Sequence, residues 1–569
     1  MNHQEQVAAI RLGKDSVFDA WIYSMLMDNN LAYVLNPHLI ASQEQLSFMV
    51  QLEPGQIYLP CSDATFHMLG SSSPALQKAY NRVWRTLVGI IQQAELNPID
   101  RHRLFQFLRI RFRQYTAQKT LLPSRLMKRI TDLIFYQSFS PIPDPWQKAR
   151  RDALQEDQQR SADATIAHIV NAVDPKTLPA TIDALRTTLH HLELVRLLVL
   201  TVLAHQKAED LAISFNRALT QAHDILPLFT PSPHQSKTIL VLPDADGSTF
   251  FEILTIQALL RMGHKVIYAV KHAPFFLSPI LADFDCDPLL ESLCKKAFVV
   301  SALSLGKNAL LAHLKTHQWL IIDDGTRERL NLYRVSVTFA RAWKEADIIL
   351  AHGWRAKDMF LETSHSFTRD IVVFWNEGTI FRIQHRPHAK ACHKFAEADI
   401  VRQAETLIGS MRKAHRENRR VMFFSCIVGS IPGETKQAIE LATVFVNHLR
   451  KQMDNMLIIN PAEHFVPGMD GDDLMYMWER VQRSGEIDIW RFQSTTDIEQ
   501  SFALLGRTVP PIWSGKDATY STGCTKEMKI ALDVQEKNPE MQIIGPDPKR
   551  FFRRGEYGVG KYVDAQFQR

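Results

Sequence analysis

An alternation of short apolar runs with helical segments constrains the fold of this chain more than any other feature. Runs of this kind, rich in β-branched residues, are typical of strands buried on both faces, as in parallel sheets covered by helices. We therefore predict an α/β domain over residues 236–390, with a mostly parallel sheet between two layers of helices. The runs are TILVL (238–242), KVIYAV (265–270), AFVV (297–300), WLII (319–322), DIIL (347–350) and IVVF (371–374).

The regions on either side of this domain differ from each other. Residues 1–235 have apolar residues at helical spacing and few β-branched runs, so we expect a helical N-terminal region that ends in the linker-like stretch TPSPHQSK (230–237). From residue 400 to 569, strand-like runs such as VMFF (421–424) and MLII (456–459) again alternate with helical segments. This part predicts a second, C-terminal α/β unit.

Composition argues against several functional classes. Lys and Arg number 66 and Asp and Glu 61, and this excess is too small over 569 residues to indicate nucleic-acid binding or a polybasic membrane surface. The apolar run at 194–204 is too short to span a bilayer. The six cysteines form no CxxC pair, and the N-terminus lacks the apolar core of a signal peptide. We expect a cytoplasmic protein that binds neither nucleic acid nor membrane; the oligomeric state stays open.

Charged residues follow the first two predicted strands. Asp244 and Asp246 lie in the turn after residues 238–242, and Lys271 follows residues 265–270. The carboxyl ends of parallel strands meet at one edge of a sheet, where open α/β sheets bind ligands. Two carboxylates on one turn suit a hard cation such as Mg²⁺, and a nearby lysine suits a phosphate. The alternative is that both aspartates only cap the turn and the following helix.

Two later turns lie at the same predicted edge. Asp324 and Gly325 follow one strand, and His352 and Gly353 follow another. These loops supply a carboxylate, backbone N–H groups at glycines and a histidine, a combination suited to holding an anion. Each loop taken alone also fits a tight connection. We predict that Asp244, Lys271, Asp324 and His352 line one cleft, a prediction that their positions after four separate strands support.

The order of these motifs resembles the damage-control phosphatases, which are metal-dependent enzymes with an ARMT-like domain. The resemblance covers roughly residues 140–390. It implies a metal-dependent hydrolase that acts on a small phosphorylated metabolite with a divalent cation such as Mg²⁺, Mn²⁺, Co²⁺ or Ni²⁺. The motifs in order are DPW (144–146), the D-x-x-G turn (244–247), GHKV (263–266), the K-x-x-P that starts at Lys271, DG (324–325) and ADIILAHG (346–353).

With the resemblance as a guide, we assign roles to the residues that match the motifs and to neighbouring residues that could substitute for missing ones. Catalysis is expected from Asp244 and His352. Substrate binding is expected from Lys271, Asp324, Gly325 and Gly353. The metal is expected at Asp244, with help from Asp246 or Asp283.

Several positions depart from the pattern of the family. Its metal turn is typically Asp-Asn-Ala-Gly, and its second ligating aspartate comes shortly after K-x-x-P. Here the corresponding positions are Ala245 and Pro279, neither of which has a side-chain oxygen. The phosphate-binding lysine and the Gly-Asn pair correspond to His352 and to His205-Gln206. We therefore expect the metal to bind more weakly than in typical members.

Two rival hypotheses follow from these departures. The first is a non-hydrolytic enzyme whose C-terminal unit contributes half of a composite site between the domains. The second is a non-catalytic binding protein that keeps the fold without the metal. The altered ligands favour these rivals, whereas the retained Asp244, Lys271 and Asp324 favour chemistry.

Other candidate sites lie outside these loops. The segment HRPHAKACH (385–393) carries ligand types that suit Zn²⁺, although it also fits a polar linker. The loop Gly429–Gly433 is one residue shorter than a phosphate loop, with Glu434 in place of its lysine. Cys524 precedes a predicted helix that is expected to lower its pKa. Further candidates are Glu463, His464, Lys516 and Asp517.

Overall fold

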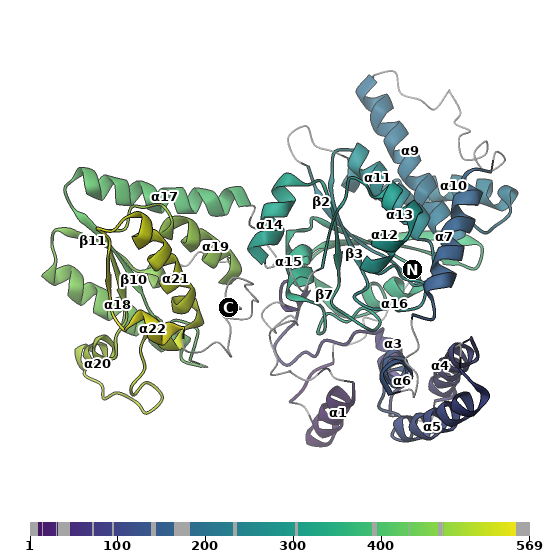
Figure 1. The fold of residues 1–569 in the computed structure, drawn as a ribbon, viewed down its shortest axis with the longest axis horizontal. Helices are drawn as coiled ribbons and strands as arrows, with labels where there is room; N and C mark the ends of the chain where they lie inside the picture. The colour runs from purple at the N-terminus through teal and green to yellow at the C-terminus, as the bar shows by residue number, and fades with distance from the viewer. Residues whose placement is uncertain are drawn as a thin grey trace. The chain divides into compact units, whose positions relative to one another are not determined.

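The computed structural model divides into two compact units, Met1–Ala389 and Lys390–Arg569 (Figure 1). Each unit contains a parallel sheet with helices, so the α/β fold class predicted from the sequence is confirmed. The structure describes residues 10–13, 15–29, 31, 46–70, 73–93, 96–137, 144–163, 182–230, 236–301, 305, 307–389, 395, 397–431, 433–464, 469 and 471–552.

The first unit is built on a seven-stranded sheet with the order β4-β5-β3-β2-β6-β8-β9. All neighbouring strands run parallel except β8 and β9, which form an antiparallel hairpin. The predicted parallel sheet is therefore present, and β9 adds an edge strand that the apolar pattern did not indicate. The strands are β2 (Thr238–Leu242), β3 (Lys265–Val270), β4 (Phe298–Val300), β5 (Trp319–Asp323), β6 (Ile348–His352), β8 (Asp370–Glu377) and β9 (Ile380–Arg386).

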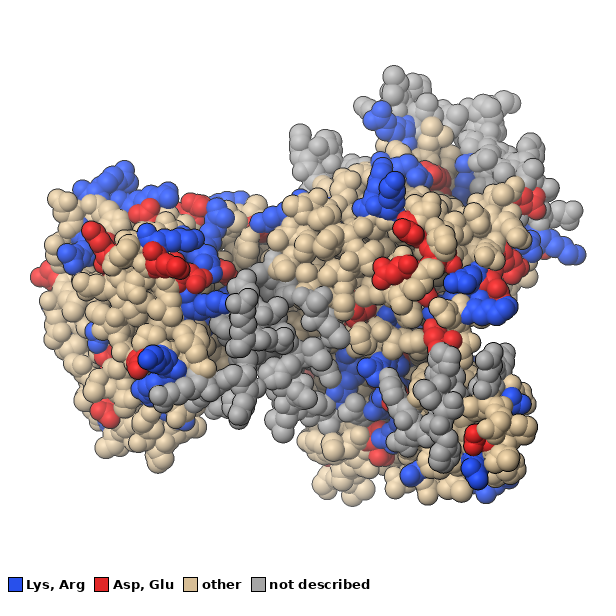
Figure 2. Space-filling model, in the orientation of Figure 1, with Lys and Arg blue, Asp and Glu red and all other residues tan. Residues whose placement is uncertain are grey.

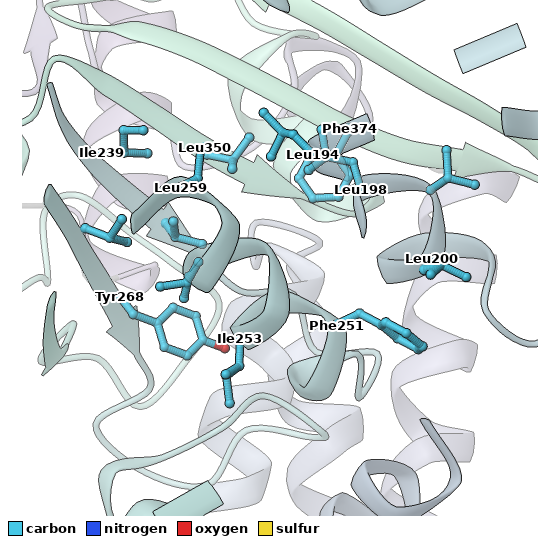
Figure 3. Close-up of a cluster of buried hydrophobic side chains, with 14 of the residues drawn as sticks. Leu194, Leu198, Leu200, Ile239, Phe251, Ile253, Leu259, Tyr268, Leu350 and Phe374 are labelled. Carbon is cyan, nitrogen blue, oxygen red and sulfur yellow. The ribbon is translucent and has the colours of Figure 1, made fainter. Parts of the chain in front are cut away.

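Both faces of this sheet are covered, which explains why its strands read as continuous apolar runs. On one face, Ile239, Tyr268 and Leu350 pack in a hydrophobic cluster with Leu194 and other residues of the helices α9, α10 and α11. Figure 3 shows these side chains pointing into that cluster. Alternate strand residues point to the other face and pack on α14, α15 and α16. The helices are α9 (Ile182–Leu203), α10 (Ala208–Ala222), α11 (Thr249–Arg261), α12 (Leu281–Cys286), α13 (Pro288–Leu293), α14 (Lys307–Thr316), α15 (Val337–Glu345) and α16 (Trp354–Phe360).

Most of the earlier part of the first unit is helical, as its periodicity predicts. Several of these helices bury their apolar faces against one another in a separate hydrophobic cluster. A short strand, β1 (Val50–Gln51), pairs antiparallel with β7 (Ser366–Phe367). The division into a helical region 1–235 and an α/β domain 236–390 stays a prediction. The helices are α1 (Ser16–Asp28), α3 (Asp63–His67), α4 (Pro74–Gln93), α5 (Pro98–Thr116), α6 (Pro123–Gln137), α7 (Gln147–Ser161) and η2 (Leu226–Phe229).

The second unit has a four-stranded parallel sheet with the order β11-β10-β12-β13. Hydrophobic clusters on both faces bury alternate residues of β10, such as Phe423 on one face and Phe424 on the other. The strands are β10 (Arg420–Ser425), β11 (Met456–Ile459), β12 (Ile489–Phe492) and β13 (Gln542–Ile544). The helices are α17 (Glu397–Arg416), α18 (Thr435–Gln452), η3 (Pro461–Glu463), α19 (Gly471–Gln482), α20 (Thr495–Leu504), η4 (Ala518–Tyr520), α21 (Thr522–Lys537) and α22 (Pro548–Phe551).

Apolar helices and surface charge bear on possible contact with a membrane. Within the described residues, no helix combines the length and apolarity needed to cross a bilayer. On the face drawn in Figure 2, basic and acidic side chains are interspersed, in keeping with the small net charge of +5.

Candidate active site

A cleft that is partly open to solvent lies at the carboxyl ends of β2, β3, β5 and β6. Its walls include Asp244, Lys271, Asp324 and His352, the four residues that the sequence predicts to share one cleft. They meet there because each follows a different strand of the same parallel sheet. Sequence reasoning did not single out Arg329 and Arg355, which also line the cleft.

Asp244 is held tightly at the end of β2. Its Oδ1 accepts a hydrogen bond from Nη1 of Arg355 at 2.9 Å, and its backbone carbonyl accepts one from Oγ of Ser278 at 3.0 Å. A Cβ atom at Gly353, where φ is +90°, would lie 1.8 Å from Oδ2 of Asp244. Only glycine at position 353 therefore leaves room for the Asp244 carboxylate.

His352 lies between two carboxylates at the end of β6. Its Nδ1 is 2.8 Å from Oε1 of Glu252, and its Nε2 is 3.3 Å from Oδ1 of Asp246 and 3.0 Å from Oγ of Ser248. Burial opposes protonation of His352, but Asp246 and Glu252 outweigh it and raise its pKa well above the ordinary value. The structure therefore favours a protonated imidazolium at this position.

Asp246 is the partly exposed member of this group. Its side chain keeps 43 % of its surface exposed, whereas Glu252 and His352 are buried. Burial of the carboxyl opposes ionisation, but the charge of His352 and hydrogen bonds from His352 and Ser248 outweigh it and lower the pKa of Asp246 to about 2. Asp246 is therefore an ionised carboxylate that reaches solvent.

A further carboxylate comes from α7, about ninety residues before the turn. Asp157 is buried, and its Oδ1 has no hydrogen-bond partner among the described residues; Nε2 of His205 lies 3.7 Å from this oxygen. Burial, assisted by the charge of Asp246, raises the pKa of Asp157 to about 7. No motif in the sequence marks this residue, because it lies in a polar stretch that reads only as an exposed helix.

Lys271 is paired inside the cleft. Its Nζ donates hydrogen bonds to Oδ2 of Asp324 at 2.6 Å and to Oγ1 of Thr326 at 2.7 Å. Asp324 accepts further hydrogen bonds from the backbone and side chain of Thr326. Asp324 therefore balances much of the charge that Lys271 brings to the cleft.

Gly325 and Gly353 have a steric role, and their N–H groups are already used in hydrogen bonds. The N–H of Gly353 donates to the carbonyl of Phe374, and the N–H of Gly325 donates to Oδ1 of Asp323. A Cβ atom at Gly325, where φ is +77°, would lie 2.6 Å from the backbone N of Ser336. The expected anion site of glycine N–H groups is therefore not formed in this structure, because the fold already uses both donors.

The structure does not bring Asp283 to the cleft wall. Asp283 lies in α12, and its two carboxylate oxygens accept hydrogen bonds from Nε and Nη2 of Arg150, both at 2.8 Å. Arg150 also donates to Asp144. Asp283 thus ties α12 to α7, and its expected role beside the metal stays a prediction.

Three side chains in the cleft region could together hold a metal ion. Within the described residues, Asp244, Asp246 and His352 form a group whose ligand atoms all lie within 4.8 Å of one another. Carboxylate oxygens suit a hard divalent cation, and imidazole suits transition metals. Histidine binds a metal only as neutral imidazole, so a cation here would displace the proton from Nε2 of His352. Arg355 already occupies one oxygen of Asp244.

Comparison with known proteins identifies the region that carries the cleft. Residues 199–355 match the damage-control phosphatase ARMT1-like domain. This domain includes all four strands that end at the cleft and stops at Arg355. No curated protein matches the chain. A solved structure of a DUF89 family protein from Pyrococcus horikoshii is similar to it at 16 % sequence identity and a TM-score of 0.35, covering 53 % of this chain and 92 % of that one.

The damage-control phosphatase family is metal-dependent, and two ligand positions in this domain are filled by other contacts. Ala245 is buried and lines the cleft without a side-chain oxygen. Ser278, which precedes Pro279, donates to the backbone of Asp244. Ser278 thus supports the turn that carries Asp244, and neither Ala245 nor Pro279 has a side-chain oxygen to offer a metal.

The other candidate sites have structural explanations where they are described. His385 and His388 both lie within hydrogen-bond distance of Oδ1 of Asp370, whereas Cys392 and His393 lie outside the described residues. The expected activation of Cys524 is wrong, because burial raises the pKa of its thiol well above the ordinary value. Glu434, Glu463, Lys516 and Asp517 contact Trp513, Arg450, Tyr520 and Arg550, respectively.

Proposed function

We propose that this chain is a metal-dependent phosphatase that hydrolyses a small phosphorylated metabolite in the cleft. The observation that carries the proposal is the group Asp244, Asp246 and His352, whose ligand atoms lie within 4.8 Å of one another in a domain of a metal-dependent family. A divalent cation held there would supply Lewis acidity toward the phosphoryl group and an activated water.

The cleft residues have complementary roles in this proposal. Arg355, Arg329 and Lys271 line the cleft as cations, and they would orient the phosphoryl oxygens of the substrate. Gly353 keeps the space in which the Asp244 carboxylate sits. Asp324 holds Lys271 in place through the 2.6 Å hydrogen bond. These contacts fix the charged groups before a substrate arrives, which lowers the cost of binding.

His352 is suited to proton transfer. Glu252 binds its Nδ1 at 2.8 Å and so orients the ring, while Nε2 faces Asp246 and Ser248. A protonated Nε2 would donate its proton to the leaving alcohol oxygen, and the two carboxylates would keep the ring protonated until that step. If a metal were held by Nε2 instead, His352 would serve as a ligand, and the attacking water would supply the proton that the leaving oxygen takes up.

The ion pair between Arg355 and Asp244 favours a second candidate function. An arginine that already neutralises Asp244 supplies positive charge where the family uses a metal. On this alternative the chain binds a phosphorylated ligand without a metal and without hydrolysis. A composite site that includes the second unit stays a further prediction.

One experiment separates these candidates. The purified chain is titrated with Mg²⁺, Mn²⁺, Co²⁺ and Ni²⁺ by calorimetry and assayed for phosphate release from a panel of phosphorylated metabolites. We expect metal binding and metal-stimulated release in wild type, loss of both in Asp244→Asn, and retention of both in the control Asp370→Asn, which lies outside the cleft lining. A wild type with neither bound metal nor metal-stimulated release would exclude the phosphatase.

A further inference from the structure

The walls of the cleft are largely apolar between its charged groups. Phe275, Leu330, Phe339, Met359 and Phe360 all line it. A small sugar phosphate carries hydroxyl groups on almost every carbon, and burying them against such walls leaves them without hydrogen-bond partners, which is costly. These walls therefore suit a ligand whose organic part is apolar or aromatic.

Two cations that line the cleft, Lys271 and Arg355, each lie near aromatic rings, of which Phe275 also lines the cleft. The Nζ of Lys271 lies 5.3 Å from the ring centre of Phe275, and the guanidinium of Arg355 lies 4.9 Å from the ring centre of Trp354 and 5.6 Å from that of Phe276. Trp354 is unusual for so large an apolar side chain, because 50 % of its surface is exposed. Such an arrangement is suited to stacking a flat ring beside an anionic group.

The loop that carries the two phenylalanines is bent in a conformation that non-glycine residues rarely adopt. Phe276 has φ of +51°, which costs free energy for a residue with a bulky side chain. The two rings contact each other edge to face, with ring centres 4.9 Å apart. Phe275 lines the cleft, and Phe276 also packs on Trp146 with ring centres 5.3 Å apart. The surrounding packing thus holds Phe275 at the cleft wall against local strain.

We infer that the cleft takes a phosphate ester whose organic part is a flat aromatic ring, with the ring against Phe275 and the phosphate among Lys271, Arg355 and His352. A nucleotide has this chemistry. The inference rests on the proposed function, because it places the substrate in the same cleft. It adds the chemical class of the organic group, which the match to the family does not supply.

A matched pair of ligands tests the ring separately from the phosphate. Adenosine 5′-monophosphate and ribose 5-phosphate share the sugar and the phosphate, and only the first has the ring. Binding of each is measured by equilibrium dialysis on the full chain, once with EDTA and once with Ca²⁺. Base stacking of this kind predicts that wild type binds the nucleotide at least about tenfold more tightly.

Variants locate the contact. Phe275→Leu keeps an apolar side chain but removes the aromatic face, and Trp354→Ala removes the exposed ring. Each is expected to reduce the preference for the nucleotide several-fold and to change binding of ribose 5-phosphate by less than about twofold. The control Tyr23→Ala removes a ring that is 58 % exposed on α1, outside the cleft lining, and should leave the preference unchanged.

The outcomes separate the inference from the proposed function. Equal binding of the two ligands to wild type, or a preference that survives in Phe275→Leu, overturns the inference and leaves a phosphate site intact. If neither ligand binds, whether EDTA or Ca²⁺ is present, the inference is overturned and the result counts against the proposed function as well. A second pair, phenyl phosphate and cyclohexyl phosphate, distinguishes a flat ring from an apolar group of similar size, and equal binding of these two would also refute the stacking.

Discussion

Replacing Gly353 by alanine should disturb the cleft strongly, because the added methyl group would overlap the Asp244 carboxylate. The residue has φ of +90°, and a Cβ atom there would lie 1.8 Å from Oδ2 and 2.4 Å from Cγ of Asp244. No rotation of the alanine relieves this contact, because Cβ is fixed by the backbone. The Asp244 carboxylate must therefore leave its position, and its hydrogen bond to Arg355 is lost with it.

The expected loss of stability has two parts. A non-glycine residue at positive φ costs about 1–2 kcal/mol. Loss of a hydrogen bond between charged groups costs about 1.5–3 kcal/mol more. We therefore expect Gly353→Ala to lower the free energy of unfolding of the first unit by roughly 2.5–5 kcal/mol, and to abolish metal binding because Asp244 moves.

Gly378 provides a matched control in the same unit. It also has positive φ, +64°, but a Cβ atom there would meet nothing within 4 Å, so Gly378→Ala should cost only the backbone part, about 1–2 kcal/mol. Both variants are measured by urea unfolding, with a separate transition fitted for the second unit, and by calorimetric titration with Mn²⁺. Equal losses of stability in the two variants, or normal Mn²⁺ binding by Gly353→Ala, would refute the argument from the contact with Asp244.

Three further predictions concern other buried groups. Burial raises the pKa of Glu527 from 4.5 to about 7. The free energy of unfolding of the second unit should therefore fall by roughly 3 kcal/mol as pH rises from about 4.5 to 7. Glu527→Gln should remove this pH dependence, as measured by urea unfolding at a series of pH values. A pH-independent wild type would contradict it. Asp283→Asn leaves the buried Arg150 without a full ionic partner and should lower the free energy of unfolding of the first unit by about 2–4 kcal/mol. It should reduce Mn²⁺ affinity far less than Asp244→Asn does, and an equal loss of affinity would place Asp283 at the metal. Gly325→Ala should destabilise the first unit by at least about 2 kcal/mol, because its Cβ would lie 2.6 Å from the backbone N of Ser336, and a neutral effect on thermal unfolding would count against this contact.

The sequence determines the sheet and the edge at which the cleft forms. Continuous apolar strands such as residues 319–322 require cover on both faces, and their alternation with helical segments indicates a parallel sheet between helices. Once that sheet is given, Asp244, Lys271, Asp324 and His352 must fall at one edge, since each follows the carboxyl end of a strand. The pattern of apolar residues therefore predicts where the charged groups meet, without any knowledge of their partners.

Tertiary structure alone decides what each charged group contacts. Glu252 lies within α11 and reads as an ordinary helical residue, yet it orients His352 because β6 pairs directly with β2, which precedes α11. Arg150 takes both oxygens of Asp283 from a helix more than a hundred residues earlier. Local periodicity reports the burial of a residue but not its partner, because side-chain pairing depends on which elements pack together and in which register.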